Sequence, residues 1–524
     1  MGNKSFFGQA TMLAIAIVVV RFLGFLYRVP LTGMLGDKGI GWYSAAFQIY
    51  TFFFIMSAFS LPASISKIVS ENIAIGRYKN AHKVFKVAYK ISLFLGFLMG
   101  AILLFGSGLF ANLLRIPETK YAMITLGPTL FVVAAMVPLR GYFQGMGDMY
   151  PTASSQVVEQ FFNAIFSVVM AYVLLTNFGL AFGAAGGTLG TGIGALAGLI
   201  YISIMYLKRK KDIFKNIDEG DQYEEDSKVI AKNMLGTMIP FIIGNTVFTF
   251  TVLIDVIMVK TGLLAADYTN DAADVIYGQW SGKYSLIINL PTSIITAIVT
   301  AIIPNIAAAK AKGKFELIRA KFERLIKVIF VVMMPTAIGL MVMGSNILEL
   351  LFPRNPGGGQ LFVVGGFTVV LVGIMKISTA TLQGMGEFWK PVKYTAIAMA
   401  TKVLLNFTLI RIPEINIYGA IIAGLIAYSI ISYFNIREIN KKLNMKVHLL
   451  KYAAKPFIAS LIMGIFTYGI YYAFSGISQN LATVISVAGA VIIYGVLVIK
   501  FKILSKEEIL ILPKGEKIVK VLKI

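Results

Sequence analysis

The sequence contains no cysteine and only two histidines among its 524 residues. Without cysteine the chain can form no disulfide bond and can perform no thiol chemistry. His82 and His448 lie in separate basic segments and lack the spacing of a metal site. No phosphate-binding loop, zinc motif or nucleophile elbow occurs, so nothing points to ATP hydrolysis or covalent catalysis. We therefore expect a protein that is not an enzyme and has no cofactor.

Charged residues are also scarce, at 14% of the chain, whereas 57% of the residues are hydrophobic and the mean hydropathy is +0.78. Soluble domains seldom approach these values, and long apolar runs without strand alternation exclude a membrane β-barrel. We predict an all-α membrane protein with 14 transmembrane helices. Their approximate ranges are 7–33, 40–66, 86–112, 121–144, 152–176, 183–207, 233–260, 281–304, 325–347, 360–383, 390–410, 417–436, 453–474 and 480–500.

Acidic residues are few compared with basic ones, 25 against 48, which gives a net charge of +23. The basic residues gather in the segments after the second, sixth, eighth and twelfth predicted helices, whereas the intervening segments are short or acidic. Basic loops stay in the cytoplasm and meet anionic lipids, so nucleic-acid binding is not needed to explain the charge. We expect a multi-pass protein of the cell membrane with both termini in the cytoplasm. The first apolar segment is too long for a cleavable signal peptide.

The chain repeats itself at an interval of 237 to 239 residues. Gln144-Gly-Met-Gly-Asp148 recurs as Gln383-Gly-Met-Gly-Glu387, Gly76-Arg77-Tyr78 recurs as Gly313-Lys314-Phe315, and Trp42 matches Trp280. This repeat predicts two parallel six-helix lobes related by a pseudo-twofold axis along the membrane normal. The predicted parts are an N-lobe (1–207), a charged cytoplasmic linker (208–232), a C-lobe (233–436), a pair of extra helices (437–500) and a basic cytoplasmic tail (501–524).

A second glycine pattern lies within the sixth predicted helix. Gly192-Ile-Gly194-Ala-Leu-Ala197 resembles a dinucleotide-binding fingerprint, but no strand precedes it, so that interpretation fails. Gly186, Gly190, Gly194 and Gly198 are spaced by four instead. A small-residue stripe of this kind lets two membrane helices pack closely.

Arg21 and Arg28 lie seven residues apart in the first apolar helix, so both guanidinium groups are on one face. Charge in a bilayer is expensive and usually faces a watery cavity or a partner. An arginine pair also suits phosphate, which the planar guanidinium group binds with several donors. We interpret both arginines as substrate-binding; the alternative for Arg28, just before Pro30, is that it extends to the membrane interface.

Further cations within helices complete the predicted substrate site: Arg140, Lys283 and Lys376. The alternative for the two lysines is again that they reach the interface. A cavity lined by cations attracts anions and repels cationic drugs, so the ligand is expected to be anionic, as a pyrophosphate is.

The acidic residues within helices are candidates for ion coupling. Asp255 in the seventh helix needs a partner, and Lys402 and Asn406, four residues apart on the eleventh, present a polar face that could supply it. The alternatives are a buried structural ion pair or a coupling site where a cation or proton competes for the carboxylate. Glu159 on the fifth helix either has a coupling role or pairs with a basic residue and fixes packing.

Three segments resemble MurJ/SpoVB-type polysaccharide-biosynthesis transporters of the multidrug/oligosaccharidyl-lipid/polysaccharide (MOP) exporter superfamily. They are Arg21-Phe-Leu-Gly-Phe-Leu-Tyr-Arg28, Leu61-Pro-Ala-Ser-Ile-Ser-Lys67 and Leu139-Arg-Gly-Tyr-Phe-Gln-Gly145. The resemblance implies two six-helix lobes around a cationic cavity, with two extra helices forming a groove for a lipid tail. It implies that Arg21 is a cavity arginine, and that Asp255 and Asn406 match groups that bind sodium in some members.

The resemblance implies flipping of an undecaprenyl-pyrophosphate-linked sugar, in MurJ the peptidoglycan precursor lipid II, across the bacterial cell membrane. Sodium, protons and the membrane potential are the candidate driving forces, and we expect a monomer. The alternatives are export of another lipid-linked oligosaccharide, capsular or spore-cortex, or cation-coupled drug antiport. An antiporter would favour acidic residues where the first helix has arginines. A scaffold without transport would not need Arg21 or Asp255 within helices.

Overall fold

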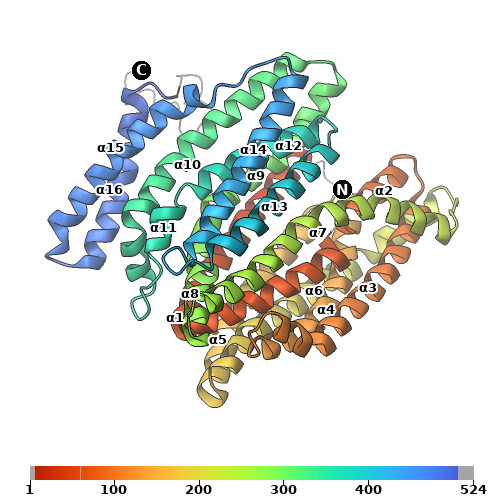
Figure 1. Ribbon diagram of the computed structural model, residues 1–524. Coiled ribbons are helices and arrows are strands. Elements are labelled where there is room, and N and C mark those ends of the chain that lie inside the picture. The colour runs from red at the N-terminus through yellow and green to blue at the C-terminus, as the bar shows by residue number, and fades with distance from the viewer. Residues whose placement is uncertain (1–5, 60, 505–524) are drawn as a thin grey trace. The chain divides into compact units, whose positions relative to one another are not determined.

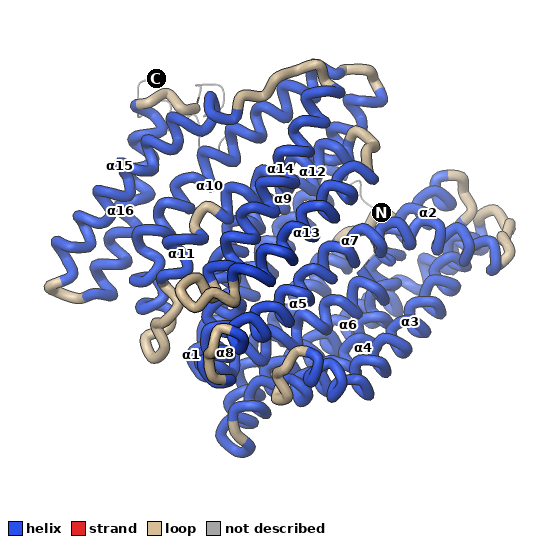
Figure 2. Tube along the Cα trace, in the orientation of Figure 1, coloured by secondary structure: helices blue, strands red, loops and turns tan. Residues whose placement is uncertain are grey.

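The computed structural model describes residues 6–59 and 61–504, and every regular element in these ranges is a helix (Figures 1 and 2). Residues 505–524 of the predicted basic tail lie outside the described residues. The described chain forms two compact units. The first comprises the residues up to Lys283 together with Asn406–Ile417, and the second comprises Tyr284–Leu405 and the residues from Tyr418 onward.

The first unit contains eight α-helices, the π-helical turn η1 and all of the π-helical turn η2 except Tyr284. They are α1 (Phe6–Phe54), η1 (Ile55–Phe59), α2 (Leu61–Ala74), α3 (Tyr78–Leu113), α4 (Thr119–Gly145), α5 (Tyr150–Phe178), α6 (Leu180–Glu219), α7 (Ser227–Ala265), α8 (Asn270–Gly278) and η2 (Gln279–Tyr284).

The second unit contains the remaining helices. They are α9 (Ser285–Ala311), α10 (Phe315–Leu351), α11 (Gln360–Gly365), α12 (Thr368–Gly384), α13 (Trp389–Leu409), α14 (Tyr418–Lys442), α15 (Leu449–Ser475) and α16 (Gln479–Lys500). The last turn of α13, from Asn406, belongs to the first unit.

Helix α1 is bent at Gly36, whose φ of 64° and ψ of −176° are not helical. Glycine adopts positive φ without the steric cost that a Cβ brings. The bend divides α1 into residues 6–35 and 37–54, and these correspond to the first two predicted membrane helices.

Nine helical stretches of the described residues are long and apolar enough to cross a membrane. The protein is therefore an all-helical, multi-pass membrane protein. Four further predicted spans lie in α7, α9, α12 and α13, which are not among these nine stretches. The count of fourteen membrane crossings therefore stays a prediction.

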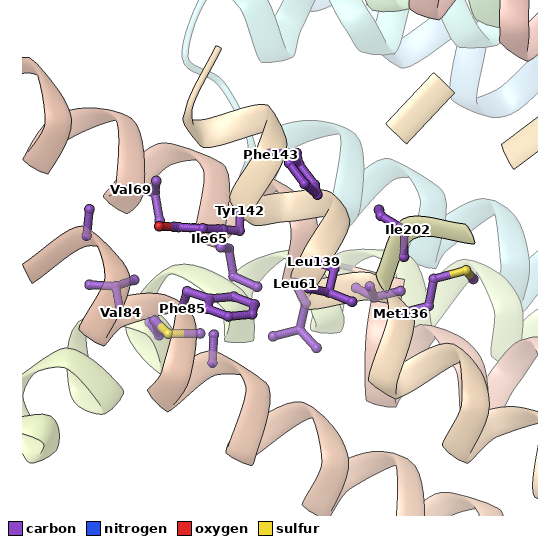
Figure 3. Close-up of a cluster of buried hydrophobic side chains, with 14 of the residues drawn as sticks. Leu61, Ile65, Val69, Val84, Phe85, Met136, Leu139, Tyr142, Phe143 and Ile202 are labelled. Atoms are coloured by element: carbon purple, nitrogen blue, oxygen red, sulfur yellow. The ribbon is translucent and has the colours of Figure 1, made fainter. Parts of the chain in front are cut away.

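The packed core of the first unit joins α2, α3 and α4 to α6 and the start of α7 (Figure 3). The rings of Phe85 on α3 and Tyr142 on α4 are stacked, with centroids 4.6 Å apart. Helix α2 fits closely against α4: a Cβ added to Gly145 would lie 2.6 Å from the Cβ of Val69. These contacts hold the ends of α2 and α3 in fixed positions.

The two copies of the repeated motif have the same local backbone in their separate units. Gly147 and Gly386 both have a φ of 77°. Gly145 packs against α2 in the first unit, and its counterpart Gly384 packs against Ile306 of α9 in the second. The sequence repeat is thus also a repeat of local structure.

The glycine stripe of α6 faces α5. A Cβ added to Gly186 would lie 2.3 Å from the carbonyl oxygen of Met170, and one added to Gly190 would lie 2.2 Å from the backbone nitrogen of Ser167. The predicted close helix contact is confirmed, and α5 is its partner.

We expect Gly190→Ala to destabilise the protein, because overpacking of this kind costs about 1–3 kcal/mol. The measurement is the melting temperature of the purified protein in detergent. Gly108→Ala on α3 is the control, because no atom lies within 4 Å of an added Cβ there. Equal melting temperatures for the two variants would contradict the close α5–α6 contact.

Candidate functional site

The two arginines of α1 differ in their surroundings. Arg21 is exposed, and within the described part of the chain it forms no hydrogen bond or ion pair. Arg28 lies against aromatic rings: its guanidinium carbon is 4.7 Å from the ring centroid of Tyr43 and 5.7 Å from that of Phe47. The hydroxyls of Tyr27 and Tyr43 are 3.3 Å apart beside it.

Cation–π contacts hold a guanidinium group without neutralising its charge. The aromatic side chains around Arg28 therefore fix its position and leave the positive charge available to an anion. Within the described ranges, neither arginine forms an ion pair with a carboxylate.

Arg140 on α4 and Glu159 on α5 form an ion pair with each other. Arg140 donates from Nη2 to Glu159 Oε2 at 2.7 Å and from Nε to the hydroxyl of Ser155 at 3.0 Å. The pairing of Glu159 with a basic residue, which the sequence left open, is therefore present. Arg140 lies 8% exposed, so this pair joins α4 to α5 in a mostly buried position.

Asp255 on α7 and Asn406 on α13 are in direct contact within the first unit. The amide nitrogen of Asn406 donates to Asp255 Oδ1 at 2.8 Å, and both side chains are buried. The predicted proximity of these helices is confirmed. The amide oxygen of Asn406 is buried and has no hydrogen-bond partner among the described residues. Lys402, one turn earlier on α13, is also buried.

Lys283 and Lys376 lie in different units. Lys283 is in η2, is fully buried and ends in an ion pair with Asp37 of α1. Such burial excludes the alternative that Lys283 reaches the membrane interface. Lys376 on α12 is half-buried and donates to the hydroxyl of Thr296 at 2.8 Å.

The pair between Asp37 and Lys283 belongs to a larger network where α1, α7, α8 and η2 meet. Lys260 of α7 forms an ion pair with Asp274 of α8, and their side chains are only 1% and 7% exposed. Asp274 also accepts a hydrogen bond at 3.1 Å from the indole of Trp42. We call these five residues, Asp37, Trp42, Lys260, Asp274 and Lys283, the ion-pair crossing.

Sequence reasoning missed three members of the ion-pair crossing, Asp37, Lys260 and Asp274, as partners. Lys260 ends the seventh predicted membrane helix, and Asp274 lies between the seventh and eighth predicted helices. The signal for the two acidic residues was their position shortly before the tryptophans of the repeat, Asp37 before Trp42 and Asp274 before Trp280. Among the described residues, no group of three or more His, Cys, Asp or Glu side chains is arranged to hold a metal ion.

Comparison with known proteins identifies the family. Residues 8–310 match the family described as "Polysaccharide biosynthesis protein", and residues 222–488 match the family "Lipid II flippase MurJ". Each match spans more than half of the chain. The chain belongs to the MurJ flippases and polysaccharide biosynthesis proteins of the MOP superfamily. It is therefore a membrane transporter of a flippase family.

Relatives from Bacillus subtilis (strain 168) match along nearly the whole length. "Stage V sporulation protein B" is 25% identical over 520 residues, which cover 98% of both chains. "Lipid II flippase MurJ" is 24% identical over 506 residues, which cover 92% of both chains.

Solved structures share the fold at low sequence identity. A lipid II flippase MurJ in an inward closed conformation has a TM-score of 0.66 and 14% identity, with coverage of 94% of this chain and 99% of that one. An inward-facing multidrug resistance MATE family transporter has a TM-score of 0.68 and 15% identity, with coverage of 82% and 98%. The fold is thus that of MurJ and MATE transporters.

We expect Asp274→Asn to destabilise the protein strongly, because it leaves the buried Lys260 without its counter-charge. Breaking a buried ion pair costs about 3–5 kcal/mol. The matched control is Asp271→Asn, because Asp271 pairs with Lys38 at 2.6 Å but its side chain is 80% exposed, and exposed pairs contribute only about 0–1 kcal/mol. Thermal unfolding of the two variants in detergent is the measurement. A similar loss in both would show that burial does not govern this network.

Proposed function

We propose that the protein moves an undecaprenyl-pyrophosphate-linked cell-wall precursor, lipid II, from the inner to the outer leaflet by alternating access. Its family and its MurJ relative support a lipid-linked substrate. The observation that carries the proposal is Arg21, a cation within an apolar helix that no described carboxylate neutralises. A charge in that position needs an anionic partner, and the pyrophosphate of the substrate supplies it.

The proposed architecture has fourteen membrane helices in two six-helix lobes, residues 1–207 and 233–436, followed by a helix pair within 437–500. The common backbone of the two repeated motifs supports the two lobes. Helices α15 and α16 are the pair that would line a groove for the lipid tail. Basic loops favour cytoplasmic termini, with the linker 208–232 and the tail 501–524 on the same side.

Five cations are proposed to bind the anionic substrate in turn. Arg21 and Arg28 come first, because their charge is not compensated by a carboxylate in the contacts above. Arg140 and Lys283 each hold a carboxylate, so they would bind pyrophosphate only by exchanging that partner. Lys376 donates a hydrogen bond to a hydroxyl. An uncharged hydroxyl is replaced by an anion more easily than a carboxylate is.

Asp255, Asn406, Lys402 and Glu159 are proposed to couple transport to a driving force. The carboxylate of Asp255 and the amide oxygen of Asn406, which accepts no hydrogen bond from the described residues, offer oxygen ligands of the kind that a hard cation prefers. Lys402, one turn before Asn406 on α13, is proposed to contribute its charge to coupling, and sodium, protons and the membrane potential are the candidate driving forces. Glu159 would act by releasing Arg140.

Arg21→Ala should abolish growth of a strain depleted of its own lipid II flippase, and Arg21→Lys should restore growth only in part. A charge-assisted hydrogen bond contributes about 1.5–3 kcal/mol, so substrate affinity should fall about tenfold or more. Lysine cannot reproduce the bidentate guanidinium geometry. The measurements are growth, membrane insertion and the accessibility of lipid II at the outer surface.

Arg354→Ala, which removes an exposed arginine from the loop between α10 and α11, is the control and should complement fully. Normal flipping by an inserted Arg21→Ala protein would refute the role proposed for Arg21.

Asp255→Asn should impair flipping while leaving the amount of inserted protein near normal, because the amide keeps the shape of the side chain and removes only its charge. Flipping is measured in proteoliposomes under sodium, proton and electrical gradients applied one at a time. The gradient whose effect disappears in the variant identifies the driving force. Full transport by the variant under every gradient would make Asp255 a structural residue.

A spore-cortex precursor is the second candidate substrate, because the match to the stage V sporulation protein extends over 98% of both chains. This candidate predicts that the gene restores cortex formation in a strain without that protein and fails to support growth of the flippase-depleted strain. The requirement for Arg21 would be the same, because both precursors carry a pyrophosphate.

A further inference from the structure

The segment between α6 and α7 is folded against the start of α3 within the first unit. We call residues 220–226 the linker strap. Asp221 of the strap pairs with Arg77 at 3.2 Å, and Glu224 pairs with Lys83 at 3.0 Å and with Lys79 at 3.4 Å. The hydrogen bond from Lys83, joined by the one from Lys79, lowers the pKa of Glu224 below its ordinary value.

Backbone contacts hold the linker strap in one position. The amide of Asp221 donates to the carbonyl of Gly76 at 3.1 Å, and the amide of Glu225 donates to the side-chain oxygen of Asn80 at 2.8 Å. The ring of Tyr223 lies under the guanidinium group of Arg77, with 4.1 Å between the Arg77 Cζ atom and the ring centroid. The strap therefore contacts Arg77 through both the carboxylate of Asp221 and the ring of Tyr223.

A polar cavity of about 660 Å³ lies between the linker strap, α2, α3 and the start of α7. Its cations are Lys67, Arg77 and Lys232, and its acidic residues are Glu71 and Glu225. Ligand cavities commonly have volumes of about 300–1,000 Å³, so this one is large enough for a headgroup. Neither the predicted transport site nor the ion-pair crossing includes any of these residues.

Exposed ion pairs are weak, about 0–1 kcal/mol each, and salt screens them. A phosphate group carries more charge than a carboxylate and binds guanidinium groups in bidentate geometry. Such an anion can therefore replace Asp221 as the partner of Arg77.

We propose that this cavity is a second anion site, which binds a phosphate-bearing group through Lys67, Arg77 and Lys232, and that Asp221 of the linker strap is its tethered competitor. The anion is either a free phosphate compound or the headgroup of an anionic phospholipid. This site is separate from the proposed transport route and does not depend on which lipid-linked precursor the protein moves.

The test uses the full chain in nanodiscs, in an Arg21→Ala background so that the proposed transport site does not contribute to binding. The first probe is radiolabelled inorganic pyrophosphate with zwitterionic lipid. The second is phosphatidylglycerol, counted on the protein by native mass spectrometry without pyrophosphate. Binding of the first probe identifies a soluble phosphate source, and binding of the second alone identifies a lipid headgroup.

Lys232→Gln should weaken binding of the effective probe about tenfold, because it removes one charge-assisted contact. Its matched control is Lys228→Gln, one turn earlier on α7, where no described ion pair or cavity contact is lost. Asp221→Asn should strengthen binding severalfold, because the competitor is gone. Asp218→Asn removes the same charge from the end of α6, where the described residues give its carboxylate no ion pair and it does not line the cavity, and should change nothing.

Two results would overturn the proposal. One is that neither probe binds, or that binding is equally strong in the Lys232→Gln and Lys228→Gln variants. The other is that Asp221→Asn and Asp218→Asn change the affinity by the same amount, because the strap would then act only through net charge.

Discussion

The cost of removing charge from water governs this structure. Lys260 and Lys283 are among the largest fully buried side chains of the described residues, and each ends on a carboxylate. The desolvation penalty is several kcal/mol per ion, so each lysine is tolerable only when its partner is in place. The backbones must also approach closely: a Cβ on Gly278 would lie 1.7 Å from the carbonyl oxygen of Asp37. The ion pairs and the glycine together fix the position of α8 against α1.

The predicted substrate cations of the first unit thus fall into two kinds. Arg140 and Lys283, which are themselves buried, each pair with a carboxylate of a neighbouring element and so hold helices together. Arg28 is held by the ring of Tyr43 instead, and Arg21 is exposed. An aromatic ring orients a cation without cancelling its charge. For the anionic substrate proposed above, only the second kind leaves a positive potential, whereas the first kind holds the helices in place.

Hydropathy and glycine spacing predicted the helical fold and a close helix contact along α6, because both depend on local periodicity. The proximity of Asp255 and Asn406 was predicted because a carboxylate within a membrane helix needs a polar partner, and the family resemblance pointed to the same pair. The ion-pair crossing could not be derived in this way: Trp42 and Asp274 are 232 residues apart, and no spacing along one helix relates them. The partners of Arg140 and Lys283 could not be predicted from the sequence either. Helical periodicity shows which residues of a helix share one face, but not which residue of a neighbouring helix will contact them.

The same physics sets an order of strength among the ion pairs. Pairs within the ion-pair crossing are shielded from solvent, so salt and competing anions reach them poorly. Pairs of the linker strap are open to both, since Arg77 and Asp221 have side chains 38% and 49% exposed. A competing anion is therefore expected to separate the strap from α3 at a much lower concentration than is needed to break the buried ion pairs that join α1 and α7 to α8 and η2. Burial, rather than the number of charges, decides which contacts of this basic protein are permanent and which can be exchanged.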